Sequence, residues 1–385
     1  MRVVMCAETF TPAVNGVVNS VRHVARCLHA AGHEVTIVAP TGDALAVPGG
    51  QIPVVTVPSV GVPGYRTLRV ARPGVDLRRV LFDLDPDVVH LASPALLGQA
   101  AADAARVIDR PVAAVFQTDL AAFVSRHRAG VPVPTFAREG MRSRTWRWLR
   151  EIHAGADVTL APSRATLEQL RQRGFPRLAL WPRGVDAARF HPGHRDAAVR
   201  GQLLGGRHLL VGVVARLAAE KRIELLAATT RLPAVRLVVV GDGPMRQFLQ
   251  RELPDALFTG ELVGDELGRV VASLDVLAHP GADETFCQSV QEALAAGVPA
   301  VVAASGGPLD LVDHDRNGLL WRGDDPAVLA ALVGGLSDPS TRLRLAAAAR
   351  PSVAHRTWEG VTASLVGHYE RMVAERAAAA RRSAA

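Results

Sequence analysis

The 385-residue sequence has few cysteines, a single lysine and no long apolar run. Its three cysteines, Cys6, Cys27 and Cys287, are too few and too widely spaced for a disulfide framework or a cysteine-based zinc site. No apolar run approaches the roughly 20 residues that a membrane-spanning helix needs, and the start lacks the pattern of a signal peptide. With 49% hydrophobic and 21% charged residues, the composition excludes disorder. We therefore expect a cytoplasmic globular protein of two or three domains.

Lysine is almost absent, because Lys221 accounts for one of the 44 Lys+Arg residues and arginine for the other 43. This usage suggests a position that needs a compact ammonium group rather than a planar guanidinium, although chance would give the same count. Positive charge is also uneven. Residues 1–190 carry 23 Lys+Arg against 15 Asp+Glu, whereas residues 191–385 carry 21 against 22. A basic half beside a neutral half indicates an anionic partner that one domain alone contacts.

Short apolar runs alternate with helical patterns in both halves, and this alternation predicts parallel sheets covered by helices on both faces. Predicted helices include 17–31, which Gly32 would close, and 94–108. The strands predicted in the same way are 2–6, 34–39, 54–57, 88–91, 112–116 and 158–161 in the first half, and 209–214, 235–240, 257–259, 276–278 and 300–303 in the second.

A stretch rich in proline and glycine, residues 181–193, separates the two series of strands, so we place the domain boundary near 190. We expect an α/β fold with one Rossmann-like domain over 1–190, a second over 191–357, and a last helix with a frayed end over 358–385. When two doubly wound domains face each other, the carboxyl ends of both sheets border a deep cleft, where open α/β folds bind ligands.

Two glutamates, Glu284 and Glu292, stand eight positions apart after a predicted strand. Glu284 is expected in the loop and Glu292 two turns inside the following helix. The backbone amides of Phe286, Cys287 and Gln288 at the helix start would meet an anion, because N–H groups without intrahelical partners point outward there. The two carboxylates would then hold hydroxyl groups at either end of a diphosphate. The alternative is a surface helix with two solvated acids.

Arg216 follows the first strand of the second half, and Lys221 comes five positions later. Two cations in one loop suit a diphosphate leaving group, whose negative charge grows as its bond breaks. The alternative is an exposed loop in which Glu220 and Lys221 form a weak surface pair. Gly16 lies between the first strand and the first helix, where a residue without Cβ lets a ligand approach the backbone.

Four segments in this order resemble the retaining GT-B glycosyltransferases of family 4. They are the Asn-Gly loop at 12–17, the linker at 184–192, the Arg…Glu-Lys loop at 216–221 and the Glu-x7-Glu block at 284–299. The sequences at 116–119 and 284–288 look closest to those of bacterial GDP-mannose-dependent α-mannosyltransferases that build glycolipids. The resemblance implies two facing Rossmann-like domains, with the nucleotide sugar on the second, the acceptor on the first, and the last helix crossing back onto the first.

The resemblance also implies roles for individual residues. Arg216, Lys221 and Glu284 would form the catalytic set. The implied nucleotide-sugar contacts are Arg216 and Lys221 with the diphosphate, Glu284 with the sugar hydroxyls, Glu292 with the ribose, the amides of Phe286, Cys287 and Gln288 with sugar and phosphate, and Gly16 with the phosphate from the other domain. The reaction would retain the anomeric configuration through an oxocarbenium-like transition state, with no cofactor and no strict need for a metal.

The acceptor side departs from the family pattern. Gln117 stands where many members carry histidine, Arg183 where asparagine is usual, and Ala215 where glycine is usual. Any role of an imidazole at position 117 is therefore absent. Asp119 and Asn15 are the nearest polar candidates for acceptor contact.

The expected function is transfer of a hexose, foremost mannose from GDP-mannose, to a glycolipid or a small polyol or sugar acceptor in an alpha linkage. One alternative is a UDP-sugar enzyme for a soluble acceptor such as a secondary metabolite. A glycoside phosphorylase on the same fold is another, because free phosphate would suit Arg216 and Lys221. An epimerase would need an acid/base cluster that the sequence does not show, and the intact charged residues argue against a non-catalytic binding protein. No nucleic-acid partner is expected.

Residues 126–150 hold seven arginines against one acid, Glu139. Arginines attract anionic headgroups, and indole rings favour the headgroup region. We therefore expect this stretch to contact an anionic membrane at its inner face or an anionic lipid acceptor. The alternative is a solvated arginine face with at least one tryptophan packed in the core. The side chains concerned are Arg126, Arg128, Arg138, Arg142, Arg144, Arg147, Arg150, Phe136, Trp146 and Trp148.

Overall fold

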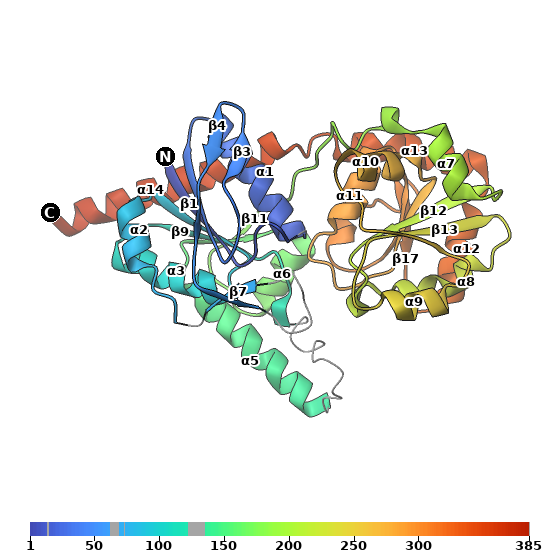
Figure 1. Cartoon of the computed structure of the whole chain (residues 1–385). Coiled ribbons are helices and arrows are strands. Elements are labelled where there is room, and N and C mark those ends of the chain that lie inside the picture. The colour runs from blue at the N-terminus through green and yellow to red at the C-terminus, as the bar shows by residue number, and fades with distance from the viewer. Residues whose placement is uncertain (14, 62–68, 73, 122–134, 385) are drawn as a thin grey trace. The chain divides into compact units, whose positions relative to one another are not determined.

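The computed structural model describes residues 1–13, 15–61, 69–72, 74–121 and 135–384, with the backbone alone for 135–138 and 383–384. Contacts divide the chain into two compact units (Figure 1). Unit 1 is Met1–Arg183 with Trp358–Ala385, and unit 2 is Gly184–Thr357. The boundary expected near 190 lies at Gly184 instead, because Val185 and Phe190 are buried in the core of unit 2.

Unit 1 is built on a parallel sheet. Its seven strands are β1 (Arg2–Ala7), β2 (Glu34–Ala39), β5 (Val54–Thr56), β8 (Val88–Ala92), β9 (Val112–Val115), β10 (Val158–Ala161) and β11 (Leu178–Leu180). They lie in the order β11-β10-β9-β8-β1-β2-β5. Two antiparallel hairpins join β3 (Leu45–Val47) to β4 (Gly50–Ile52) and β6 (Ser59–Gly61) to β7 (Arg69–Ala71). The sequence predicted the first six sheet strands to within one residue, but not β11 or the hairpins.

Helices cover both faces of this sheet because its strands are apolar throughout. The helices are α1 (Gly16–Ala30), α2 (Arg78–Leu84), α3 (Leu96–Val107), α5 (Thr135–Ala154), α6 (Arg164–Gln172) and α14 (Trp358–Ala384). Alternate residues of β1 face opposite layers. Val3 and Met5 pack in the core formed with α1 and α14, whereas Val4 and Cys6 pack in the core formed with α2 and α3. Helix α14 contacts α1 within unit 1 (Figure 1).

Unit 2 repeats this design with a parallel sheet of six strands. They are β12 (Leu209–Val214), β13 (Val235–Val240), β14 (Leu257–Gly260), β15 (Val276–His279), β16 (Ala300–Ala303) and β17 (Gly318–Trp321), in the order β14-β13-β12-β15-β16-β17. The α-helices are α7 (Ala197–Leu204), α8 (Ala227–Thr230), α9 (Arg246–Glu252), α10 (Gly264–Ser273), α11 (Gln288–Ala295), α12 (Pro326–Gly335) and α13 (Pro339–Val353). Single 3₁₀ turns are η1 (Pro192–His194), η2 (Ala219–Lys221), η3 (Ile223–Leu226) and η4 (Gly307–Asp310).

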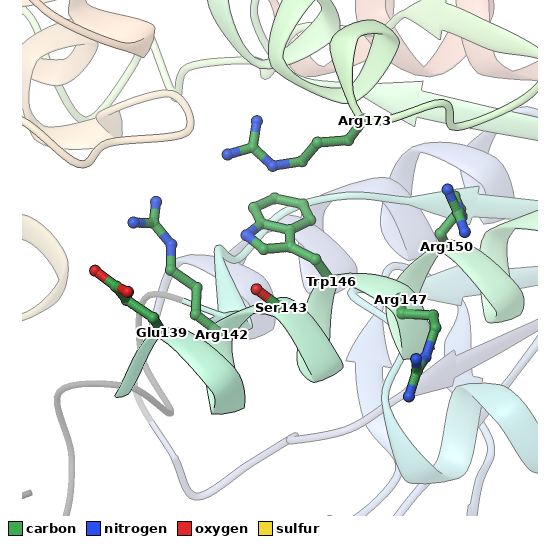
Figure 2. Close-up of a pocket in the computed structure, with 7 residues that line it drawn as sticks. All are labelled: Glu139, Arg142, Ser143, Trp146, Arg147, Arg150 and Arg173. Atoms are coloured by element: carbon green, nitrogen blue, oxygen red, sulfur yellow. The ribbon is translucent and has the colours of Figure 1, made fainter. Parts of the chain in front are cut away.

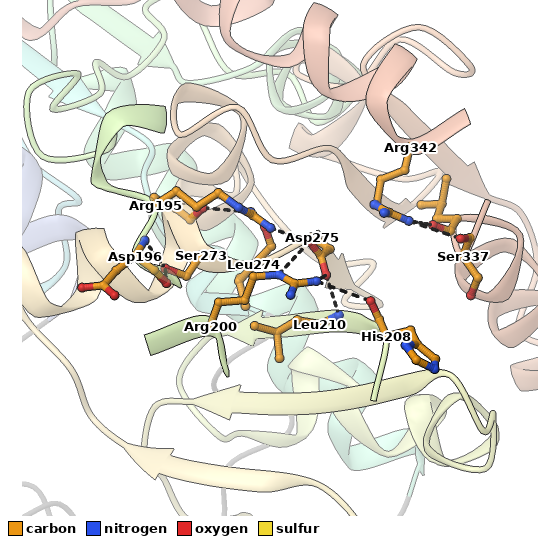
Figure 3. A network of polar contacts seen from close by, with 12 residues as sticks. Arg195, Asp196, Arg200, His208, Leu210, Ser273, Leu274, Asp275, Ser337 and Arg342 are labelled. Atoms are coloured by element: carbon orange, nitrogen blue, oxygen red, sulfur yellow. Dashed lines mark hydrogen bonds and ion pairs between the residues drawn. The ribbon is translucent and has the colours of Figure 1, made fainter. Parts of the chain in front are cut away.

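An ion network around the buried carboxylate of Asp275 lies at the amino ends of the central strands of the unit 2 sheet (Figure 3). Asp275, just before β15, accepts from Arg195 at 2.7 Å, from Arg200 at 2.8 Å and from the amide of Leu210 at 2.9 Å. Burial alone would raise the pKa of Asp275, but Arg200, the Leu210 amide and Arg195 lower it. The network ties the segment around α7 to the amino end of the sheet, away from the loops at its carboxyl end.

The strand order identifies where each unit can bind a ligand. In both sheets the order reverses beside the first strand, between β1 and β8 in unit 1 and between β12 and β15 in unit 2. Ligands of open α/β sheets bind outside the carboxyl ends of the strands at such a point. The loop with Arg216 and Lys221 follows β12, and the loop with Glu284 follows β15. The prediction of two Rossmann-like domains is confirmed, and the cleft expected between them stays a prediction.

Candidate active site

Two loops of unit 2 bring Lys221 and Glu284 into contact, although 63 positions separate them. The Lys221 ammonium Nζ donates to Oε1 of Glu284, and Nε2 of His279 lies 2.9 Å from the same oxygen. Lys221 ends the turn η2 after β12, whereas His279 is the last residue of β15. The side chains of Lys221 and Glu284 are 20% and 14% exposed, and that of His279 is 3% exposed. A charged cluster therefore stands at the point where the strand order reverses.

Each member of this cluster is held in its charged form. Burial alone would raise the pKa of Glu284, but Lys221 and His279 bring it well below its usual range. Burial alone would lower the pKa of Lys221, but Glu284 raises it. Burial also disfavours the charged form of His279, yet Cys287 and Glu284 raise its pKa to about 10. At neutral pH the site therefore holds one carboxylate between an ammonium and an imidazolium group.

A glycine allows the two loops to approach. A Cβ atom on Gly281 would lie 3.1 Å from Nε2 of His279 and 3.4 Å from Cα of Lys221. Sequence reasoning missed His279. Its signal was its place directly after the predicted strand 276–278, at the edge of the sheet where site residues gather.

Arg216, the other predicted diphosphate ligand, donates from Nη2 to Oε1 of Glu220 at 2.5 Å and keeps a side chain that is 40% exposed. The alternative in which Glu220 pairs with Lys221 on the surface is not what the structure shows, because Glu220 pairs with Arg216 and Lys221 with Glu284. Both cations thus contact carboxylates of the same unit.

Glu292 lies on α11 and has different neighbours. Burial raises the pKa of Glu292 to about 8. A hydrogen bond with the Gln288 side chain and the charge of Arg189 act to lower this pKa, whereas the charge of Asp186 acts to raise it. Nε2 of Gln288 also donates to the carbonyl oxygen of Gly184 at 3.0 Å. The structure therefore places Glu284 and Glu292 in two separate environments.

The start of helix α11 is shaped by its backbone. Cys287 adopts a left-handed conformation with φ of 80° and precedes the first helical residue, Gln288. The Phe286 side chain is buried in the core, so only its backbone can serve a ligand. A Cβ on Gly307 would lie 2.3 Å from Cα of Phe286, and the Gly307 amide donates to the carbonyl of Glu284 at 2.7 Å. The loop after β16 thus supports the loop that carries Glu284.

One group of residues has the ligand atoms for a metal ion. Among the described residues, donor atoms of His279, Glu284 and Cys287 lie within 4.8 Å of one another. Within this group, Oε1 of Glu284 contacts the Lys221 ammonium.

In unit 1, Asn15 has a structural task. Its Oδ1 accepts from the amides of Val17 and Val18, each at 3.0 Å, and so caps helix α1. This cap places Gly16 at the first position of the helix. Asp119 lies partly exposed beyond the end of β9.

The basic stretch lies mainly on helix α5. Arg126 and Arg128 fall outside the described residues, as do the side chains of Phe136 and Arg138. Trp146 is 9% exposed, with its ring stacked on Phe116 at 5.6 Å and the Arg173 guanidinium 4.3 Å from its centre. This packing withdraws Trp146 from any membrane contact. A cavity of about 710 Å³ is lined by Glu139, Arg142, Ser143, Trp146, Arg147, Arg150 and Arg173 (Figure 2).

Within the ranges that the structure describes, no helix is both long and apolar enough to cross a bilayer.

Comparison with known proteins agrees with this architecture. Residues 14–189 match the family model Glycosyltransferase Family 4, and residues 208–339 match Glycosyl transferases group 1. The GDP-mannose-dependent alpha-mannosyltransferase of Corynebacterium glutamicum is 41% identical, over 97% of this chain and 90% of its own length. The enzyme of the same name from Mycolicibacterium smegmatis is 43% identical, over 98% and 99%.

A solved structure supports the fold independently. Sucrose-phosphate synthase from Thermosynechococcus elongatus superposes with a TM-score of 0.79 over 97% of this chain and 99% of its own, at 20% identity. At that identity the likeness concerns the GT-B fold alone. Because relatives above 40% identity cover nearly the whole chain and both halves match the corresponding family models, this chain belongs to glycosyltransferase family 4.

Proposed function

We propose that this glycosyltransferase moves mannose from GDP-mannose to a glycolipid or a small polyol or sugar acceptor, with retention and in an alpha linkage. The observation that carries the proposal is the near-full-length identity of 41% and 43% to two enzymes named GDP-mannose-dependent alpha-mannosyltransferases. The charged cluster of unit 2 supports it, because it offers cations and a carboxylate together at the ligand-binding edge of the sheet.

The nucleotide sugar would be bound by unit 2 through its charged groups. Lys221 and Arg216 would neutralise the diphosphate, whose charge grows as the bond to the sugar breaks. Glu284 would accept hydrogen bonds from hydroxyl groups of the sugar. Before the nucleotide sugar binds, both cations contact carboxylates of the same unit, Lys221 at Glu284 and Arg216 at Glu220.

The remaining contacts involve helix α11 and unit 1. Glu292 would accept from the ribose hydroxyls, and the amides of Phe286, Cys287 and Gln288 would meet sugar and phosphate oxygens. Gly16 would let the diphosphate approach the start of α1. Asn15 and Asp119 would contact the acceptor, in which case Asn15 would use its amide nitrogen, because its oxygen already caps α1.

Transfer in this site would not require a metal ion. Oε1 of Glu284 already contacts Lys221, and Arg216 supplies a second positive charge. Dialysis against EDTA, with metal content checked by mass spectrometry, should leave the transfer rate unchanged. A rate that falls with EDTA and returns with a divalent cation would contradict this part of the proposal.

The arginines of α5 would bind an anionic leaflet or an anionic lipid acceptor. Figure 2 shows Arg142, Arg147 and Arg150 along α5 on both sides of Trp146 in the chain. Among the described residues, neither Arg142 nor Arg147 forms an ion pair. Each cation near an anionic leaflet contributes about 1 kcal/mol to the free energy of membrane binding. The double variant Arg142→Glu/Arg147→Glu should lose sedimentation with anionic vesicles at low salt. Arg79→Glu is the control for a charge change elsewhere on unit 1, because this arginine is 93% exposed on α2, where it pairs with Asp83 at 3.8 Å.

The nucleotide is tested first. Ligand binding stabilises the folded state by RT ln(1 + [L]/Kd), so GDP should raise the Tm more than UDP, ADP or TDP. The second step measures transfer of labelled mannose from GDP-mannose to a lipid extract and to small polyols. A Tm response to UDP instead would favour the alternative with a UDP-sugar and a soluble acceptor. Release of a sugar phosphate that depends on added phosphate would favour a glycoside phosphorylase.

A further inference from the structure

The charged cluster of unit 2 includes a thiol that the proposed transfer does not use. Cys287 is 5% exposed and stands directly before helix α11. Its sulfur lies within 4.8 Å of ligand atoms of His279 and Glu284. In the function proposed above, Cys287 contributes only its backbone amide. The buried sulfur therefore needs an explanation of its own.

Three different kinds of ligand atom meet at this point: a thiol sulfur, an imidazole nitrogen and a carboxylate oxygen. These are the three groups with which proteins bind Zn²⁺, and a thiolate favours zinc over hard cations. Mg²⁺ instead prefers a shell of oxygen ligands. Three protein ligands would leave the fourth tetrahedral position of a zinc ion to water. The donor set is therefore typical of a zinc site with one exchangeable position.

Neighbouring parts of the sheet edge hold these ligands in place. His279 is the last residue of β15 and its side chain is 3% exposed, whereas Glu284 stands in the loop that follows. The amide of Gly307 donates to the carbonyl oxygen of Glu284 at 2.7 Å and so supports this loop. Because the ligand atoms are already gathered, an ion would need little rearrangement of the backbone in order to bind.

The ammonium group of Lys221 is the competitor for such an ion. It donates to Oε1 of Glu284, so an ion bound to that oxygen would displace it. Zinc binds a neutral imidazole and a thiolate, so its binding would release one proton from His279 and one from Cys287. No electron is transferred. One divalent cation would replace two protons, so the net charge of the cluster would not change.

We propose that His279, Glu284 and Cys287 form an inhibitory zinc site: Zn²⁺ binds to them, displaces Lys221 from Glu284 and thereby stops glycosyl transfer. The inhibition rests on the function proposed above, in which Lys221 and Glu284 both contact the nucleotide sugar. The ion acts as an inhibitor and not as a cofactor, which is compatible with transfer that needs no metal.

Calorimetric titration of the EDTA-treated, full-length chain with Zn²⁺ tests binding without any substrate. The parent should bind Zn²⁺ at a site that Cys287→Ser weakens about 10-fold or more, because serine keeps the size of the side chain but removes the sulfur. Cys27→Ser is the matched control, because Cys27 is half-buried on α1 of unit 1, and it should bind as the parent does. Mg²⁺ at the same concentration should give no signal. Equal affinity in the parent and in Cys287→Ser would overturn the proposal.

Cobalt provides a readout that a merely structural cysteine would not change. Co²⁺ bound in place of Zn²⁺ should show the charge-transfer absorption of a cobalt–thiolate bond, which Cys287→Ser should remove. Absence of this band in the cobalt-loaded parent would overturn the proposal.

The displacement of Lys221 has a test of opposite sign. Lys221→Ala removes the competing ammonium group, so it should bind Zn²⁺ about fivefold more tightly or better. Unchanged or weaker binding in this variant would contradict the displacement.

A pair of histidines offers a competing site. The rings of His191 and His194 have their centres 6.1 Å apart, and both residues are exposed. His194→Gln should bind Zn²⁺ as the parent does. Binding that is lost in His194→Gln and kept in Cys287→Ser would overturn the proposal.

Inhibition is then measured as transfer of labelled mannose at GDP-mannose concentrations below KM, with free Zn²⁺ set by a chelator buffer. Zn²⁺ at about ten times its Kd should lower the rate of the parent and of Cys27→Ser about 11-fold, since the empty fraction is 1/(1 + [L]/Kd). EDTA should restore both rates. Cys287→Ser, compared with its own rate without zinc, should lose less than half. Full activity of the zinc-loaded parent would overturn the proposal, whereas a parent that binds Zn²⁺ as expected but transfers no mannose would refute the proposed function instead.

Discussion

Replacement of Lys221 by arginine tests the ammonium group in the charged cluster. The Lys221 side chain is 20% exposed and contacts Oε1 of Glu284, and the loop at Gly281 packs close to its Cα. A guanidinium is larger and planar and pairs with a carboxylate through two donors. We therefore expect the arginine to bind Glu284 more fully and to serve a departing diphosphate less well.

The size of the effect follows from the role. Loss of one preorganised group aimed at charge that develops in the transition state costs about 2.7–4 kcal/mol, or about 100–1000-fold in kcat. Folding should be little affected, because the arginine keeps an ion pair with Glu284. The assay measures kcat and KM for transfer of labelled mannose from GDP-mannose, together with the Tm of each protein.

The adjacent residue provides the control. Arg222 pairs with Asp324 at 2.8 Å, and the Asp324 side chain is 81% exposed. Exposed ion pairs contribute only about 0–1 kcal/mol, so Arg222→Lys should keep activity within twofold. If Lys221→Arg also stayed within twofold, the reasoning from the single lysine would be refuted. A large loss in Arg222→Lys would show that the loop itself, rather than the ammonium group, is sensitive.

Three further predictions concern the glutamates, one histidine and the tryptophans. Glu292→Ala should raise KM and nearly keep kcat, because contacts with the ribose are the same in the ground state and the transition state. Glu284→Ala should instead lower kcat. The reverse pattern would refute these two roles. The environment of His279 raises its pKa to about 10. The contribution of its protonated ring to the stability of the folded protein is therefore complete below about pH 6.5 and is lost as pH rises through 10. Urea titrations from pH 7 to 10 should therefore show a falling free energy of unfolding, and His279→Gln should flatten the curve. Trp146→Ala should destabilise unit 1 by about 3–5 kcal/mol, and Trp148→Ala by less.

The strands were predictable because their signal is local. Runs such as Val235–Val240 are apolar and β-branched throughout, which is typical of a strand buried on both faces. The strand β17 (Gly318–Trp321) escaped prediction because four residues that begin with glycine carry too little of that signal. The two tryptophans were predicted in part. Their spacing favoured burial of at least one of them, and the buried one is Trp146.

The contacts of the site were harder to predict than its residues. Lys221 and Glu284 were both identified from their loops, but their pairing depends on β12 and β15 being neighbours. Strand order is a property of the assembled sheet, and no local pattern encodes it. The contact between Gln117 and Arg183 was inaccessible for the same reason, although both positions were recognised as departures from the family.

His279 resolves an apparent conflict in the cluster. Lys221 and Glu284 contact each other in this structure, yet the proposed function assigns them to different parts of the nucleotide sugar, so we expect binding to separate them. Separation of a buried pair usually costs about 3–5 kcal/mol, because one charge is left uncompensated. Nε2 of His279 lies 2.9 Å from the same carboxylate oxygen, and with its pKa raised to about 10 the ring stays protonated. Glu284 therefore still has a positive charge beside it when Lys221 moves to the phosphate. We therefore expect His279→Gln to weaken GDP binding at least 10-fold in calorimetry, although the ring itself need not touch the nucleotide. Unchanged affinity would show that Lys221 can leave Glu284 without a second cation in place.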